Sequence, residues 1–228
     1  MPVLGDHLAF GLWEEAAHLA PVDRAVRTLA AVAGIDSQAA ADWPVDERDR
    51  ALIEARCRAF GPAADFYVHC PSCGEALETR FDLEPLLALE PDGAPTLAWS
   101  GRDYALRAPT SREVARAARA GEAYALVRAC IVGLDEDEEG PEPALVEASL
   151  DKAFPLLNVS IGFTCASCDT SFSKRFDAPA WLWTDIERLA RALIDEVHLL
   201  AAAYGWTEEE ILGLGRRRRA AYLARLAA

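Results

Sequence analysis

Cys70-Pro71-Ser72-Cys73 and Cys165-Ala166-Ser167-Cys168 are two Cys-x-x-Cys pairs, and they lie 95 residues apart. Their surroundings match at the same offset, because Arg80-Phe81-Asp82 corresponds to Arg175-Phe176-Asp177. The sequence therefore contains one short unit twice.

The two copies of the unit are residues 64–82 and 159–177. In each copy the pattern predicts a strand, a tight turn at the cysteine pair and a returning strand. Apolar residues alternate before each turn, namely Phe66 and Val68 in the first copy and Ile161 and Phe163 in the second. Both copies are therefore predicted to be zinc knuckles.

Four cysteines are the predicted metal ligands: Cys70, Cys73, Cys165 and Cys168. Four thiolates complete a tetrahedral zinc shell, and each Cys-x-x-Cys turn supplies two of them. Closing the 91-residue loop between Cys73 and Cys165 costs roughly 4 kcal/mol. A structural zinc ion contributes about 10 to 16 kcal/mol in small peptides. We therefore predict one structural zinc ion with no open position for water.

Disulfides and redox activity are the alternative interpretations of the four cysteines. A redox Cys-Pro-x-Cys motif normally opens a helix in a βαβ unit, and the matched second pair argues against that context. His69, the only histidine near a pair, is predicted to face solvent. Cys57 and Cys130 lie on apolar helical faces, where we expect buried small side chains.

Composition limits the class of protein. With 228 residues, 52% of them hydrophobic, the chain can bury the core of one large domain or two small ones. Its net charge of −14 repels a polyphosphate backbone, which disfavours nucleic acid as a partner. No apolar stretch has the length of a membrane span, and residues 1–6 lack the basic and apolar regions of a signal peptide, so we expect neither feature. We expect a cytoplasmic protein with reduced thiols and no membrane partner.

Turn residues divide the first half of the chain into short helices and a hairpin. Residues 7–60 predict short helices, and residues 96–99 and 104–107 predict a hairpin around Ser100-Gly101-Arg102-Asp103. Thr110-Ser111-Arg112-Glu113 is a capping box that should start a helical region running to about Gly133.

An acidic run follows between Asp135 and Pro143, with the acids Asp135, Glu136, Asp137, Glu138, Glu139 and Glu142. It lacks the alternating ligands of a calcium loop, so we predict a solvated loop. A helix across residues 145–154 then leads into the second knuckle.

The C-terminal region gives the clearest helical pattern. From about Pro179 to Ala203 one face is apolar, with Leu182, Ile186, Leu189, Leu193, Val197, Leu200 and Tyr204. Charged residues including Asp185 and Arg188 are expected on the other faces. Gly205 should end this helix, and Thr207-Glu208-Glu209-Glu210 is a second capping box.

A last helix opens with Arg216-Arg217-Arg218-Arg219. This basic helix would suit either nucleic acid or an acidic protein surface, and the net charge favours the second.

Together these patterns predict an α+β protein in which a small zinc-clamped antiparallel β unit is flanked by N-terminal and C-terminal helices. The predicted regions are 1–63 (helical), 64–178 (zinc-knuckle unit, with a helical insertion at about 110–155) and 179–228 (helical).

The order of motifs resembles small baseplate-family proteins encoded beside contractile phage tails and extracellular contractile injection systems. The C-terminal signature comprises Glu196–Ala201, Tyr204–Leu212 and Arg217–Leu223. Earlier matching segments are Leu12–Glu14, Pro21–Ala25, Phe60–Pro62, Arg107–Glu113 and both cysteine pairs. The resemblance covers most of the chain.

This resemblance implies a non-enzymatic baseplate component or assembly factor of a phage-tail-like particle, with other baseplate or tail proteins as partners. The four histidines are dispersed, and the sequence shows no hydrolase motif or phosphate-binding glycine loop after a strand, so we predict no catalytic residues. The alternative is a zinc-ribbon regulator that binds nucleic acid through its C-terminal basic helix.

Overall fold

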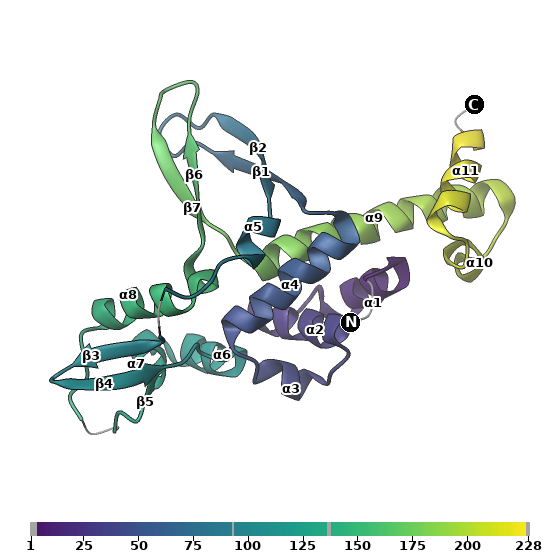
Figure 1. The fold of residues 1–228 in the computed structure, drawn as a ribbon. Coiled ribbons are helices and arrows are strands. Elements are labelled where there is room, and N and C mark those ends of the chain that lie inside the picture. Colours follow the sequence, from purple (N-terminus) through teal and green to yellow (C-terminus); the bar gives the residue numbers. More distant parts are fainter. Residues whose placement is uncertain (1–3, 93, 136–137, 227–228) are drawn as a thin grey trace.

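The computed structural model describes residues 4–92, 94–135 and 138–226, and its fold is α+β, as expected (Figure 1). Its one short 3-10 helix among these residues is η1 (Pro155–Asn158). The α-helices are α1 (Asp6–Ala16), α2 (Pro21–Ala33), α3 (Ser37–Ala41), α4 (Val45–Phe60), α5 (Glu84–Leu87), α6 (Ser111–Ala120), α7 (Ala123–Ala129), α8 (Pro143–Ala153), α9 (Ala178–Tyr204), α10 (Glu208–Leu212) and α11 (Arg216–Leu226).

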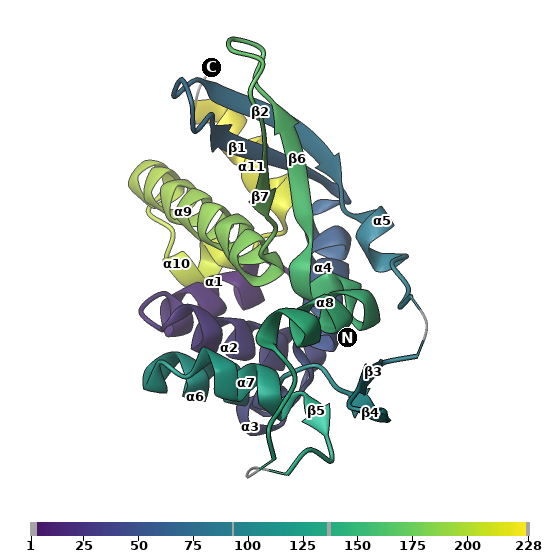
Figure 2. The same ribbon diagram turned by 90° about the vertical axis from the view of Figure 1, so that its left-hand side faces the viewer.

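The described strands form three small antiparallel sheets. One hairpin pairs β1 (Ala63–His69) with β2 (Ala76–Asp82), and another pairs β6 (Ser160–Thr164) with β7 (Ser171–Arg175). The third sheet has the order β3-β4-β5, with β3 (Thr96–Trp99), β4 (Arg102–Leu106) and β5 (Ile131–Val132). Figures 1 and 2 show the two hairpins together at one end of the molecule and the third sheet at another.

A helical body made of α1, α2, α4 and α9 holds these parts together. Its buried core includes Leu12, Leu29, Leu52 and Ile186, which come from all four helices. The 27-residue α9 is about 40 Å long, so it continues past this core and carries α10 and α11 (Figure 1). None of the described helices combines the length and the apolar character that a membrane span requires.

Caps define both ends of α9, and the end at Gly205 is the one that the sequence predicts. The Asp177 side chain accepts a hydrogen bond from Ala180 N at the start, and Gly205 adopts a left-handed conformation (φ +69°) at the end. The second capping box is confirmed, since Glu210 N donates to Thr207 Oγ1 and Thr207 N donates to Glu210 Oε2.

One charged residue of α9 differs from the sequence expectation. Asp185 is buried, although it was predicted away from the apolar face. Arg56 of α4 explains this position, because its Nε donates to Asp185 Oδ2 at 3.0 Å. The same guanidinium donates to the carbonyls of Gly61 (2.6 Å) and Ala63 (2.7 Å), so it ties α9 to the start of the first hairpin.

The third sheet also departs in detail from the sequence expectation. Ser100 and Gly101 both have positive φ, so these two residues suffice to turn the chain. Arg102 therefore starts β4 and pairs with Trp99, whereas we expected it in the turn. The helical region expected to about Gly133 consists of α6 and α7, which are separated at Gly121, and it ends at Ala129 because β5 pairs with β4 just after it.

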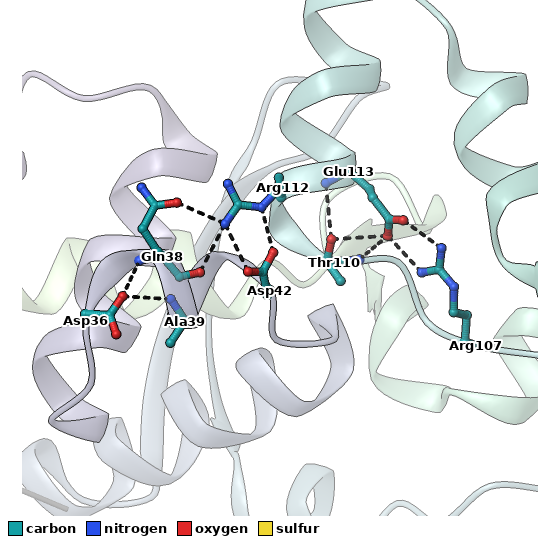
Figure 3. Close-up of polar contacts among 8 residues, drawn as sticks. All are labelled: Asp36, Gln38, Ala39, Asp42, Arg107, Thr110, Arg112 and Glu113. Carbon is teal, nitrogen blue, oxygen red and sulfur yellow. Dashed lines mark hydrogen bonds and ion pairs between the residues drawn. The ribbon is translucent and has the colours of Figure 1, made fainter.

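Figure 3 shows how α6 is fastened to α3 and to the end of the third sheet. Arg112 donates from Nε to Asp42 Oδ1 at 2.6 Å and from Nη2 to Gln38 Oε1 at 3.1 Å. The predicted capping box at Thr110 is confirmed, and Arg107 donates to both carboxylate oxygens of Glu113 at 2.6 and 2.8 Å.

These contacts make Glu113 a pH-dependent part of the fold. The hydrogen bonds from Arg107 lower the pKa of Glu113 to about 2, against the opposing effect of burial and with help from the Thr110 backbone. A carboxylate with a lowered folded pKa stabilises the protein above its unfolded pKa of about 4.3, and the contribution disappears as pH falls through the folded value.

We therefore expect Glu113→Gln to be less stable than wild type at pH 7. The difference in unfolding free energy should shrink between about pH 4.5 and pH 2 in denaturant titrations. A difference that stays constant over that range would contradict this assignment.

Candidate metal centre

The two cysteine turns have the same backbone geometry, which confirms the repeat. In the first hairpin Cys70 N donates to Glu75 O at 2.9 Å and Gly74 N donates to Cys70 O at 3.0 Å. In the second, Cys165 N donates to Thr170 O at 3.0 Å and Asp169 N donates to Cys165 O at 2.9 Å. Each bond of one turn therefore has its counterpart 95 residues away.

The residue after each pair adopts a left-handed conformation. Gly74 has φ +76° and Asp169 has φ +56°. Glycine reaches this region without steric cost, and aspartate is among the few other residues that visit it routinely. This conformation helps to reverse the chain between the two paired strands of each hairpin.

An aromatic cluster joins the hairpins below the turns. The Phe66 ring of β1 lies 3.7 Å from the Trp181 ring and 6.1 Å from the Phe176 ring, measured between centroids. Ile53 of α4 and Phe163 of β6 are buried in the same cluster. The apolar cluster thus brings two distant chain segments together independently of any metal.

The structure places all four predicted ligands in one group. The sulfurs of Cys70, Cys73, Cys165 and Cys168 all lie within 4.8 Å of one another. Cys70 and Cys168 are 3.6 Å apart, as are Cys73 and Cys165. Tetrahedral thiolate bonds of about 2.3 Å place sulfurs roughly 3.8 Å apart, whereas a disulfide requires about 2.05 Å. The group therefore fits a tetrahedral metal ion, and its cysteines are free thiols.

Burial divides the four sulfurs into two kinds. The first cysteine of each pair, Cys70 or Cys165, is buried, whereas the second, Cys73 or Cys168, is exposed. The cluster therefore lies at the surface of the hairpin tips, with one side open to solvent. A small chelator or thiol reagent would reach the two exposed sulfurs first.

Hydrogen bonds give the exposed thiols different acidities. The Thr170 hydroxyl and backbone lower the pKa of Cys168 to about 6. A backbone hydrogen bond from Glu75 lowers the pKa of Cys73, but contacts with Cys168 and the other clustered thiols and partial loss of hydration outweigh it and raise this pKa to about 12. Thr170 was missed in the sequence because the first copy has Glu75 at this position.

The remaining cysteines and His69 lie outside the cluster. His69 is exposed, as predicted. Cys130 is buried, its Sγ lies 3.3 Å from Leu126 O, and burial raises its pKa to about 11. Cys57 was also predicted to be buried, but it is half-buried because it lies at the rim of the aromatic cluster.

The acidic run forms no second metal site in the part of the chain that the structure describes, where the cysteine cluster is the only candidate group. Glu136 and Asp137 lie outside the described residues. Glu138 packs back on the third sheet, since Tyr104 Oη donates to its Oε1 at 3.2 Å.

Comparisons with protein-family models, curated proteins and solved structures found no match to this chain.

Proposed function

We propose that the cysteine cluster binds one zinc ion with a structural role. Four thiolates in a tetrahedral arrangement favour zinc among the common divalent ions. The four protein sulfurs complete the shell, so zinc would clamp the hairpin tips while the aromatic cluster holds their bases. The clamp would join segments that are 95 residues apart.

We further propose that the protein is a non-enzymatic baseplate component or assembly factor of a contractile phage-tail-like particle. The observation that carries this proposal is the paired-cysteine cluster, standing between the N-terminal and C-terminal motifs that resemble baseplate-family proteins. A rigid clamped unit beside a long projecting helix suits a protein that works through contacts with other proteins. The aromatic rings of Tyr204, Trp206 and Tyr222 support this function, because they gather at the projecting end within 4.7 to 5.6 Å of one another.

Deleting the gene in a host that produces contractile particles tests this proposal. We expect few or no complete sheathed particles by electron microscopy, and recovery when the wild-type gene is supplied in trans. A Cys57→Ser gene should restore particles equally, because this cysteine is outside the cluster. Normal numbers of functional particles after deletion would contradict the proposal. Mass spectrometry of purified particles then separates a permanent component from an assembly factor that leaves.

A further inference from the structure

The C-terminal helix α11 has a charge opposite to that of the rest of the molecule. It contains five arginines and no acid. The net charge of −14 is therefore the sum of +5 on α11 and −19 on the remaining residues. Such a concentrated cationic helix on an acidic body requires a physical explanation.

Two of the five arginines attach α11 to the body. Arg219 is buried, donates to Asp6 of α1, and donates from Nε to Glu196 of α9 at 2.7 Å. Arg216 donates to the other carboxylate oxygen of Asp6 at 2.6 Å. The helix is therefore held in a fixed orientation, with its opposite face turned away from the body.

The other three arginines of α11 face solvent. Arg217, Arg218 and Arg225 are exposed, and none has a hydrogen bond or ion pair with another described residue. Arg218 and Arg225 are seven residues apart, which is two helical turns or about 10 Å along one side of the helix. Because α11 is already docked, these guanidinium groups present a preformed row of donors.

We propose that this outward face of α11 binds an acidic helix of a partner protein, with carboxylates on successive turns opposite the three arginines. The inference rests on the proposed function, in which this protein acts through contacts with tail proteins, and it specifies the chemistry of one such contact. Guanidinium groups suit this role because they bind carboxylates in a bidentate manner. Opposite charge would also accelerate encounter with the partner.

The negative charge around α11 favours a short acidic protein segment over a nucleic acid as its partner. Duplex DNA carries one charge about every 1.7 Å and would extend well beyond a three-arginine row. The chain just before α11 carries Glu208, Glu209 and Glu210 in the first turn of α10, all of them exposed. A long polyanion would meet these carboxylates and the acidic body, whereas a helix of two or three turns would not.

Binding of defined probes tests this inference with the full-length protein. The first probe is a fluorescent alanine-rich helical peptide with glutamates at positions i, i+4 and i+7, measured by anisotropy at low salt. We expect the variant Arg217→Ser/Arg218→Ser/Arg225→Ser to bind it about tenfold more weakly than wild type, because three exposed ion pairs are removed. The matched control is Arg116→Ser/Arg119→Ser/Lys174→Ser, which removes the same charge from exposed positions elsewhere and should bind like wild type.

Equal binding curves for wild type and the α11 variant, whether both bind or neither does, would overturn the inference. Tighter binding of duplex DNA that is lost in the α11 variant would replace the acidic helix with a polyphosphate. Dimerisation of the wild type in sedimentation, lost in the α11 variant, would replace it with a second copy of this chain. The peptide-binding measurement uses no tail particles. It can therefore contradict the α11 contact while gene deletion still abolishes particles, so the α11 contact and the assembly function are tested separately.

Discussion

Replacing Cys165 with serine is expected to release the metal and to remove much of the stability of the protein. Serine is a poor zinc ligand, so three sulfurs would remain and the clamp between the hairpins would fail. Structural zinc contributes about 10 to 16 kcal/mol in small peptides, and a typical domain is stable by only about 5 to 15 kcal/mol. The apolar contacts between the hairpins remain, so we expect a loss on the order of 5 kcal/mol. Elemental analysis and denaturant unfolding measure the two effects directly.

Cys57→Ser is the matched control for this substitution, because it changes a half-buried cysteine outside the cluster. It should retain one zinc ion per chain and unfold within about 1 kcal/mol of wild type, as is usual away from special contacts. Wild-type protein without stoichiometric metal, whose four clustered thiols react freely under native conditions, would contradict the zinc assignment. A metal-free Cys165→Ser variant as stable as wild type would instead limit zinc to a role outside folding.

The parts of the fold that the sequence predicts correctly are those encoded by neighbouring residues. The hairpins follow from alternating apolar residues around each Cys-x-x-Cys turn, and the capping boxes at Thr110 and Thr207 follow from a spacing of three residues. The cluster of four cysteines is predictable for a different reason. One metal ion needs both incomplete turns, so local chemistry implies a distant contact.

The parts that the sequence does not predict depend on partners far along the chain. Nothing near Asp185 indicates that Arg56, 129 residues away, makes its burial favourable. The short strand β5 was missed because Ile131 follows a helical pattern and pairs with Leu106 only through tertiary contact. The same limit applies to the metal site, since hairpin packing decides which sulfurs are exposed.

The arginines that open α11 illustrate this limit most clearly. The sequence presents Arg216 to Arg219 as one cationic block, with an acidic protein surface as its expected contact. The structure divides the block, because helical geometry turns Arg219 toward Asp6 and Glu196 while Arg217 and Arg218 face solvent. Internal attachment and the proposed external binding therefore belong to different residues.

Arg219→Ala is consequently expected to destabilise the C-terminal region strongly. The Arg219 side chain is 2% exposed and contacts Asp6 and Glu196, which are 14% and 27% exposed. Its removal would leave two partly buried carboxylates without their main partner. Breaking a buried ion pair by removing one partner costs about 3 to 5 kcal/mol. We expect about 3 kcal/mol here, since Glu196 keeps access to water and Arg216 still contacts Asp6.

Arg218→Ala provides the control, because it removes the same side chain from the adjacent position, where it has no ion pair with a described residue. Denaturant unfolding should place this variant within about 0.5 kcal/mol of wild type. Hydrogen exchange should show faster exchange of α10 and α11 amides in Arg219→Ala alone, because Arg219 also donates to Leu214 O, between the two helices, at 2.6 Å. Equal stability and equal exchange in the two variants would mean that Arg219 does not anchor α11. A loss confined to Arg219→Ala would establish that the outward arginines are presented by a helix fixed from its opposite side.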